Sequence, residues 1–437
     1  MSEKLIELEN RILSLTAEYS KEKFNNHKFI PGVTYIPPSG KLLGGEEIHN
    51  MVQASLEAWL TTGRFNVEFE KELANFLGVN FCLSVNSGSS ANLVAFNTLT
   101  SPLLGKRAIN KGDEVIGVAA GFPTTVNPII QFGAIPVFVD VDIETHNINV
   151  DLIEEAITPK TKAVMLAHAL GNPFNVEKVK EICDKHNLWL IEDTCDALGA
   201  ELNGKKVGTF GDIGTLSFYP AHHITMGEGG AVFMNSRKLK KIAESFRDWG
   251  RDCFCAPGKS DTCGCRFTQQ HGELPYGYDH KYVYSHCGYN LKITDMQAAC
   301  GLAQIKKIES FIDARRKNFE YLREGLKDLD FLQLTKPTDN SNPSWFGFPM
   351  TVTESSPISR NELIEFLEEK RIGTRLLFAG NLIKQPYFQK DVNYRVDGEL
   401  TNTDLTMKNT FWIGVQPSLT KEMLDYVIDA FQEIDKK

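Results

Sequence analysis

Residues 217–230 read SFYPAHHITMGEGG, and the rest of the chain can be interpreted outward from this stretch. A hydroxyl residue and an aromatic residue lead into two histidines, and a glycine-rich turn follows. This order is typical of a short strand that delivers one side chain into a cleft, because glycines let the backbone approach a ligand closely. The delivered side chain is the imidazole of His222. A histidine pair that merely ends a strand above a loop would give the same pattern.

Short β-rich runs alternate with helical patterns on the N-terminal side of this stretch and just beyond it, from about residue 64 to residue 235. The alternation predicts an α/β fold with a mostly parallel seven-stranded sheet between two layers of helices. Ligands of such sheets bind at the carboxyl ends of the strands. The seven runs are FCLSV, EVIGVAA, IPVFVDV, AVMLAHA, LWLIED, IGTLSFY and AVFMN.

The patterns around this sheet predict three parts. Residues 1–60 read as an N-terminal segment of helices and a loop, and residues 61–310 as the large domain that contains the sheet. Residues 311–437 read as a smaller C-terminal α/β domain. A cysteine-rich insertion interrupts the large domain at about residues 250–286.

Composition excludes several classes of protein. The formal charge is −9 and no basic block is present, which argues against a nucleic-acid partner. No run approaches the roughly 18 apolar residues of a membrane span, and the first residues lack the apolar core of a signal peptide. We therefore expect a cytoplasmic protein. Nine cysteines without an export signal favour free thiols or metal ligands over disulfides.

Two further groups follow predicted strands. Gly88 and Ser89 lie in NSGSS, where a strand gives way to a helical run, so the helix N-terminus there could bind an anion. A plain N-cap would look the same. Asp193 ends the run LWLIED, where it could bind a ligand, cap a helix or form a salt bridge.

Ser217, Phe218 and residues 228–230 (EGG) carry a resemblance to a known family. They resemble the cofactor-lysine strand of the fold-type I pyridoxal-phosphate (PLP) sugar aminotransferases, with His222 in the place of the lysine. An amine can hold PLP as a Schiff base, whereas imidazole cannot form a stable imine. The resemblance therefore implies a non-covalent cofactor, pyridoxamine phosphate (PMP), with His222 as a general base. Within this family, the exchange is typical of sugar 3-dehydratases.

The same resemblance implies roles for other residues. Gly88, Ser89 and Ser217 would bind the cofactor phosphate, and Asp193 would hold a proton on the pyridine nitrogen. Phe122 in GFPTTVNP would stack on the cofactor ring, although core packing is equally open for it. Asn290 in GYNLKITDMQAA would reach the cofactor phosphate of a neighbouring subunit, which implies a homodimer with shared active sites. Lys292 stands where the family usually has arginine.

The insertion contains four thiols, and by composition zinc and an iron–sulfur cluster are both open. Cys195 precedes Cys253 by a gap of 57 residues, and Cys255 precedes Cys263 by a gap of seven. This spacing resembles the iron–sulfur 3-dehydratases of the family. It implies a [2Fe-2S] cluster held by Cys195, Cys253, Cys255 and Cys263, with Cys265 as a competitor for the last position.

The resemblance also implies a reaction. The carbon-3 hydroxyl of CDP-4-keto-6-deoxy-D-glucose would be removed in 3,6-dideoxysugar biosynthesis for the lipopolysaccharide O-antigen. An NAD(P)H-dependent flavin and iron–sulfur reductase would supply two electrons. Three alternatives stay open: a cluster-free dehydratase that uses glutamate, an ordinary sugar aminotransferase, and a non-catalytic scaffold whose thiols bind structural zinc.

Overall fold

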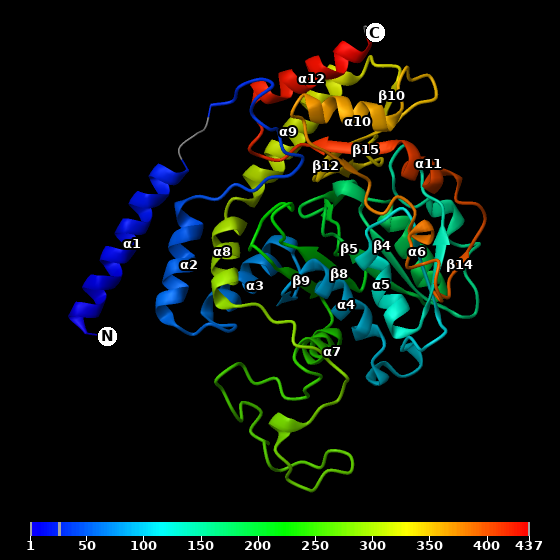
Figure 1. Ribbon diagram of the computed structural model, residues 1–437. Helices are drawn as coiled ribbons and strands as arrows, with labels where there is room; N and C mark the ends of the chain where they lie inside the picture. Colours follow the sequence, from blue (N-terminus) through cyan, green and yellow to red (C-terminus); the bar gives the residue numbers. More distant parts are fainter. Residues whose placement is uncertain (1, 25–27, 436–437) are drawn as a thin grey trace.

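The computed structural model describes residues 2–24 and 28–435. Its centre is an eight-stranded sheet with the strand order β1-β9-β8-β5-β4-β2-β3-β14 (Figure 1). The strands from β8 to β14 in this order are parallel, whereas β9 is antiparallel to both β1 and β8. The strands are β1 (Phe81–Val85), β2 (Glu114–Val118), β3 (Ile135–Val139), β4 (Thr161–Ala167), β5 (Trp189–Asp193), β8 (Ile213–Ser217), β9 (Gly230–Met234) and β14 (Arg395–Val396).

The predicted α/β class with a mostly parallel sheet is confirmed. Seven of the eight strands coincide with the seven β-rich runs of the sequence. The predicted number of strands was wrong by one, because β14 joins the edge of the sheet beside β3. This strand has two residues, which is too short for any alternation of apolar and polar residues to be visible in sequence.

Helices cover both faces of the sheet. Successive side chains of a strand point to opposite faces, so neighbouring residues of one strand pack against different helices. Ile191 packs with residues of α4 and α7, whereas its neighbour Leu190 packs with residues of α6. At the β9 side, Phe233 packs with α3 and α8. The helices are α3 (Arg64–Leu77), α4 (Gly88–Leu99), α5 (Pro123–Phe132), α6 (Val176–His186), α7 (Arg237–Arg247) and α8 (Asp295–Ile305).

The C-terminal part forms a second, four-stranded sheet in the order β10-β12-β15-β13 (Figure 1). Between β13 and β15 the chain returns to the large sheet to form β14. The division at about residue 310 stays a prediction. The elements are α9 (Ile308–Leu326), β10 (Leu332–Leu334), β12 (Gly347–Val352), α10 (Arg360–Glu369), β13 (Thr374–Leu376), α11 (Thr401–Asn409), β15 (Thr410–Gly414) and α12 (Lys421–Asp435).

Two segments project from the large sheet. Helix α1 (Glu3–Lys23) lies along α2 (Gly45–Glu57) at the edge of the molecule, and residues 250–286 form a loop below α7 (Figure 1). No helix in the described ranges is long and apolar enough to cross a membrane. A small sheet joins β6 (Glu201–Leu202), β7 (Lys205–Lys206) and β11 (Ser341–Asn342), and 3-10 turns span Pro102–Arg107, Val150–Leu152, Ala169–Gly171, His280–Tyr282 and Leu382–Lys384.

Candidate active site

The ends of β5 and β8 meet the start of α4 at one edge of the large sheet. A Cβ atom added at Gly88 would lie 2.5 Å from the Cβ of Ser217 and 3.1 Å from the Sγ of Cys195. Only glycine fits at this position, so the fold brings Gly88, Ser217 and Cys195 together. They surround the N-terminus of α4, whose unpaired backbone N–H groups favour an anion.

The first turn of α4 has the character of a phosphate cradle. The Ser87 side chain caps the helix by accepting a hydrogen bond of 3.0 Å from the Ser90 backbone N–H. Ser89 is exposed, so its hydroxyl is open to a ligand. The side-chain oxygen of Asn86 is buried and has no hydrogen-bond partner among the described residues. These features fit the phosphate of PMP or PLP.

The carboxylate of Asp193 is buried and held by three donors. Its Oδ2 accepts hydrogen bonds from Asn92 Nδ2 at 2.7 Å and from Thr125 Oγ1 at 2.8 Å. Its Oδ1 accepts a bond of 3.1 Å from the backbone N–H of Cys195. The donors come from α4, α5 and the end of β5, so three elements orient one carboxylate. Such a group fits a cationic ring nitrogen.

Phe122 forms the N-cap of α5 and is 51% exposed, so the core-packing alternative for this residue does not hold. Its ring meets Phe378 edge to face, with ring centroids 6.1 Å apart. A small cavity of about 20 Å³ lies beside it and is also lined by Thr125 and Met165. An exposed aromatic ring here can stack on a flat ligand.

His222 lies in the loop after β8 and has three neighbours. Its Nδ1 is 3.4 Å from Asp196 Oδ1, a separation that suits an ion pair. Its ring is tilted over Phe346, with centroids 5.1 Å apart, and its backbone carbonyl accepts a hydrogen bond of 3.3 Å from Arg315. Burial raises the pKa of Asp196, and the contact with His222 opposes this shift.

His223 differs from His222. It is 3% exposed, and its Nε2 lies 2.9 Å from the backbone oxygen of Ser344. Burial, with the nearby Arg315, lowers its pKa well below the ordinary value, so the ring stays neutral. His223 therefore links the loop after β8 to the C-terminal part, which leaves His222 as the candidate base.

Sequence reasoning missed Asp196, Arg315 and Phe346. Arg315 donates from Nη1 to the backbone oxygens of Trp345 and Phe346, both at 3.1 Å. Asp196 follows Cys195 directly in sequence, and this position next to a predicted site residue could have identified it. The other two residues reach the site from α9 and the loop before β12, and no local pattern could reveal that.

Asn290 is exposed at the base of the insertion, where it forms a backbone bridge with Asp248. The next backbone carbonyl, that of Leu291, accepts a hydrogen bond of 2.8 Å from Asn86, so this segment borders the phosphate cradle. The Lys292 amine lies 3.5 Å from Asp248 Oδ1. The contact of Asn290 with a neighbouring subunit stays a prediction.

Among the described residues, the sulfur atoms of the four cysteines chosen from spacing do not all lie within 4.8 Å of one another. Cys195 lies at the pocket, where burial and the nearby Asp193 raise the pKa of its thiol well above the ordinary value. Cys253, Cys255 and Cys263 lie in the insertion. All nine cysteines are free. The thiols of the insertion fit a thiophilic metal by their chemistry, and the four-cysteine set stays a prediction.

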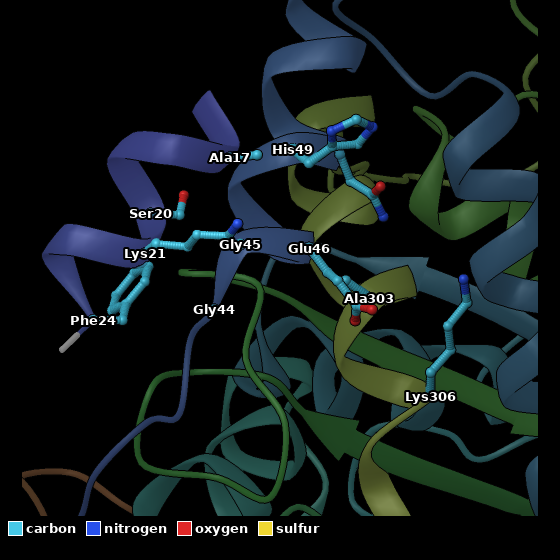
Figure 2. Close-up of a pocket in the computed structure, with 11 residues that line it drawn as sticks. Ala17, Ser20, Lys21, Phe24, Gly44, Gly45, Glu46, His49, Ala303 and Lys306 are labelled. Atoms are coloured by element: carbon cyan, nitrogen blue, oxygen red, sulfur yellow. The ribbon is translucent and has the colours of Figure 1, made fainter. Parts of the chain in front are cut away.

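A hollow of about 650 Å³ lies elsewhere, between α1, α2 and α8 (Figure 2). None of the predicted site residues lines it. The residues that line it include Ser20, Lys21, Phe24, Glu46, His49 and Lys306.

Known proteins resemble this chain over nearly its full length. It is 63% identical to the "Lipopolysaccharide biosynthesis protein RfbH" of Salmonella typhimurium over 427 residues, which are 98% of each chain. It is 49% identical to the dTDP-4-dehydro-2,6-dideoxy-D-glucose 3-dehydratase of Saccharopolyspora spinosa, over 100% of this chain and 94% of that one.

Solved structures of nucleotide-sugar 3-dehydratases also resemble this chain. The structure of a GDP-4-keto-6-deoxymannose-3-dehydratase mutant with bound GDP-perosamine is 30% identical, with a TM-score of 0.82 over 91% of this chain and 100% of that one. An Escherichia coli GDP-4-keto-6-deoxy-D-mannose-3-dehydratase with bound hydrated PLP is 29% identical, with a TM-score of 0.81 over 91% and 99%. The predicted fold-type I architecture is thus confirmed.

A family model described as "DegT/DnrJ/EryC1/StrS aminotransferase family" matches residues 43–432, which is most of the chain. The matched range contains the phosphate cradle, Asp193, His222 and the insertion. This protein therefore belongs to the DegT/DnrJ/EryC1/StrS family of nucleotide-sugar aminotransferases and 3-dehydratases.

Proposed function

We propose that this protein is a PMP-dependent 3-dehydratase that removes the carbon-3 hydroxyl of CDP-4-keto-6-deoxy-D-glucose. A [2Fe-2S] cluster and an NAD(P)H-dependent flavin and iron–sulfur reductase complete the reaction. Curated relatives named as 3-dehydratases of dTDP- and GDP-linked sugars support the reaction class. The CDP nucleotide rests on the sequence resemblance alone.

One observation carries the proposal: an imidazole, not an amine, is delivered beside the cofactor edge of the sheet. His222 is fixed there by Asp196, Phe346 and Arg315. Its Nδ1 faces Asp196, which leaves Nε2 to accept and return a proton. An enzyme that shuttles amino groups through a Schiff base would need a lysine at this position.

The other residues at the edge would hold the cofactor. Gly88, Ser89 and Ser217 would bind its phosphate, Asp193 would hold a proton on its ring nitrogen, and Phe122 would stack on its ring. When bound, PMP supplies an amine that can combine with the 4-keto group and a ring that acts as an electron sink. The protein's contribution is to orient these groups and to place one base at the reacting carbon.

The reaction must be balanced by a reductant. Replacing a hydroxyl by hydrogen releases water and consumes two electrons and two protons. The proposed ligands of the cluster that passes these electrons are Cys195, Cys253, Cys255 and Cys263. The position of Cys195 beside Gly88 supports a cluster close to the cofactor, and Asn290, at the base of the insertion, borders the same cradle.

A homodimer is part of the proposal, and α1 supports it. Its apolar side chains at positions spaced three and four apart form one stripe that is 39% to 64% exposed. A contiguous exposed apolar stripe is the kind of surface that often contacts another chain. The stripe consists of Leu5, Leu8, Ile12, Leu15 and Tyr19.

The reaction can be tested with anaerobically purified protein, PMP, CDP-4-keto-6-deoxy-D-glucose, NADH and a flavin and iron–sulfur reductase. We expect a 3-deoxy sugar product only when the reductase is present. Turnover with glutamate in place of the reductase would contradict the cluster proposal and favour the cluster-free alternative. That alternative has its own support, because one similar dehydratase structure contains a PLP-glutamate geminal diamine.

A further inference from the structure

The insertion contains a group of metal-type ligands that the spacing argument did not select. Among the described residues, Cys263, Cys265 and His280 form the group of three whose ligand atoms all lie within 4.8 Å of one another. The Sγ of Cys263 is 3.7 Å from the Nδ1 of His280. Sulfur and nitrogen ligands of a tetrahedral zinc ion lie about 3.5 Å apart, given bond lengths of about 2.3 and 2.0 Å. The observed pair needs little movement to bind one ion.

The imidazole of His280 is already oriented for such a role. It is 6% exposed, and its Nε2 lies 2.9 Å from the Oδ2 of Asp252. Its ring also stacks on His271, with centroids 5.0 Å apart and planes 13° apart. A carboxylate on one ring nitrogen, with the other nitrogen directed at the metal, is the usual arrangement of a metal-binding histidine.

We infer that Cys263, Cys265 and His280 form a binding site for a thiophilic divalent cation of the zinc class. Two thiolates and one imidazole suit zinc better than magnesium or calcium, which prefer oxygen ligands. The Oδ1 of Asp261 is 3.9 Å from the Sγ of Cys263, so this carboxylate or a water molecule can complete a tetrahedron. Binding releases the thiol protons to solvent.

This site shares Cys263 with the proposed iron–sulfur ligand set, and in that respect the inference rests on the proposed function. The two centres cannot be filled at once in one chain. Zinc at Cys263, Cys265 and His280 would leave Cys253 and Cys255 without the third ligand from the insertion. Zinc therefore excludes the cluster and holds the protein in a colourless form without electron transfer.

Full-length protein, stripped of metal under anaerobic conditions, tests the site. Zn²⁺ is titrated in competition with a chromophoric chelator, and Co²⁺ serves as the spectroscopic probe. We expect one equivalent of Zn²⁺, and tetrahedral Co²⁺ absorption with thiolate charge-transfer bands. Cys265→Ser and His280→Ala should each weaken zinc binding by tenfold or more, and Asp252→Asn should weaken it by about 10- to 100-fold.

Matched variants separate the two centres. After reconstitution with iron and sulfide, Cys265→Ser and His280→Ala should keep the wild-type iron content, whereas Cys253→Ser and Cys255→Ser should lose iron but still bind zinc. Thermal unfolding of each variant checks that the chain is folded. The inference is overturned if stripped wild-type protein binds no zinc, or if Cys265→Ser and His280→Ala bind it as tightly as wild type. A wild-type protein that binds zinc but never iron would support the zinc site and contradict the cluster.

Discussion

The two adjacent histidines after β8 have different surroundings, and these surroundings suit them to different roles. His223 is 3% exposed and bonded to the Ser344 carbonyl, whereas the side chain of His222 is 14% exposed and has a carboxylate beside its Nδ1. A base needs a nitrogen that the reacting group can reach. His222 is the better candidate on this ground, independent of any relative.

The variant His222→Lys tests this assignment. We expect 3-dehydratase activity to fall by about 10²- to 10⁴-fold, because an amine of ordinary pKa about 10.4 is protonated at neutral pH and is a poor base. The same variant should acquire a covalent link to added PLP, detected by mass spectrometry after borohydride reduction. His223→Asn is the control and should form no adduct. Undiminished activity of His222→Lys would refute the role of His222 as the base.

His146 permits a prediction about pH and stability. It is 3% exposed, and neither ring nitrogen has a hydrogen-bond partner among the described residues. Burial lowers its pKa to about 4. Between about pH 6.5 and pH 4 the unfolded chain therefore binds a proton that the folded chain does not, so the free energy of unfolding falls as pH falls through this range.

We expect the titration of His146 to lower the free energy of unfolding by about 2 kcal/mol when the pH falls from 7 to 5. His146→Phe keeps a flat ring of similar size and removes the titration, so its stability should fall less over the same interval. Urea unfolding of both proteins at the two pH values measures the difference. Equal pH dependence in both proteins would show that burial does not lower the pKa of His146 in the folded chain.

At the scale of elements, seven strands of the large sheet could be predicted because each is a short run rich in apolar and β-branched residues between turn signals. For the same reason Asp193 and Ser217 could be placed at the edge of the sheet, because they are the last residues of β5 and β8. The partners of Asp193 could not be predicted, because Asn92 and Thr125 lie 101 and 68 residues away in sequence. Only the packing of α4 and α5 against β5 brings them to the carboxylate.

The arrangement of the thiols in the insertion could not be predicted in the same way as the strands. The thiols were visible in sequence, yet their grouping was not, because the loop has no strand or long helix to fix a periodicity. His280 lies 17 residues beyond Cys263 and meets it only through the turn at His280–Tyr282. Spacing by itself selected Cys195, which the fold places at the cofactor edge.

At the junction of α4 with β8, we expect one added methyl group to lower both stability and PLP binding. Gly88→Ala would place a Cβ 2.5 Å from the Cβ of Ser217, so the start of α4 must move. We expect a loss of stability of about 1–3 kcal/mol and weaker binding of PLP, because the phosphate cradle is displaced. Urea unfolding and the fluorescence change on PLP binding measure the two effects.

Gly45→Ala is the matched control for Gly88→Ala. It lies at the start of α2, where the nearest atom to an added Cβ is Ser20 Cβ at 3.5 Å, an ordinary contact. Alanine is favoured over glycine in a helix, so this variant should be neutral or slightly stabilising. If Gly88→Ala binds PLP as tightly as Gly45→Ala does, the first turn of α4 is not the phosphate site.

At the scale of the whole molecule, the site residues do not all point inward to one chain. Phe122 and Asn290 are exposed, and so is the apolar stripe of α1. The site of a single chain is thus open to solvent at Phe122 and at Asn290. A second copy that covers Asn290 would explain why an asparagine near the phosphate cradle faces solvent.

Subunit complementation decides whether the sites are shared. His222→Asn removes the base, and Asn290→Asp places a negative charge where a phosphate is expected, so each homodimer should be nearly inactive. In a mixed dimer, one site would combine His222 of one chain with Asn290 of the other and would be intact. After unfolding and refolding of an equal mixture, half of the dimers are mixed, so we expect about a quarter of wild-type activity. If Asn290 served its own chain, no mixed dimer would contain an intact site, and the mixture would be as inactive as its parents.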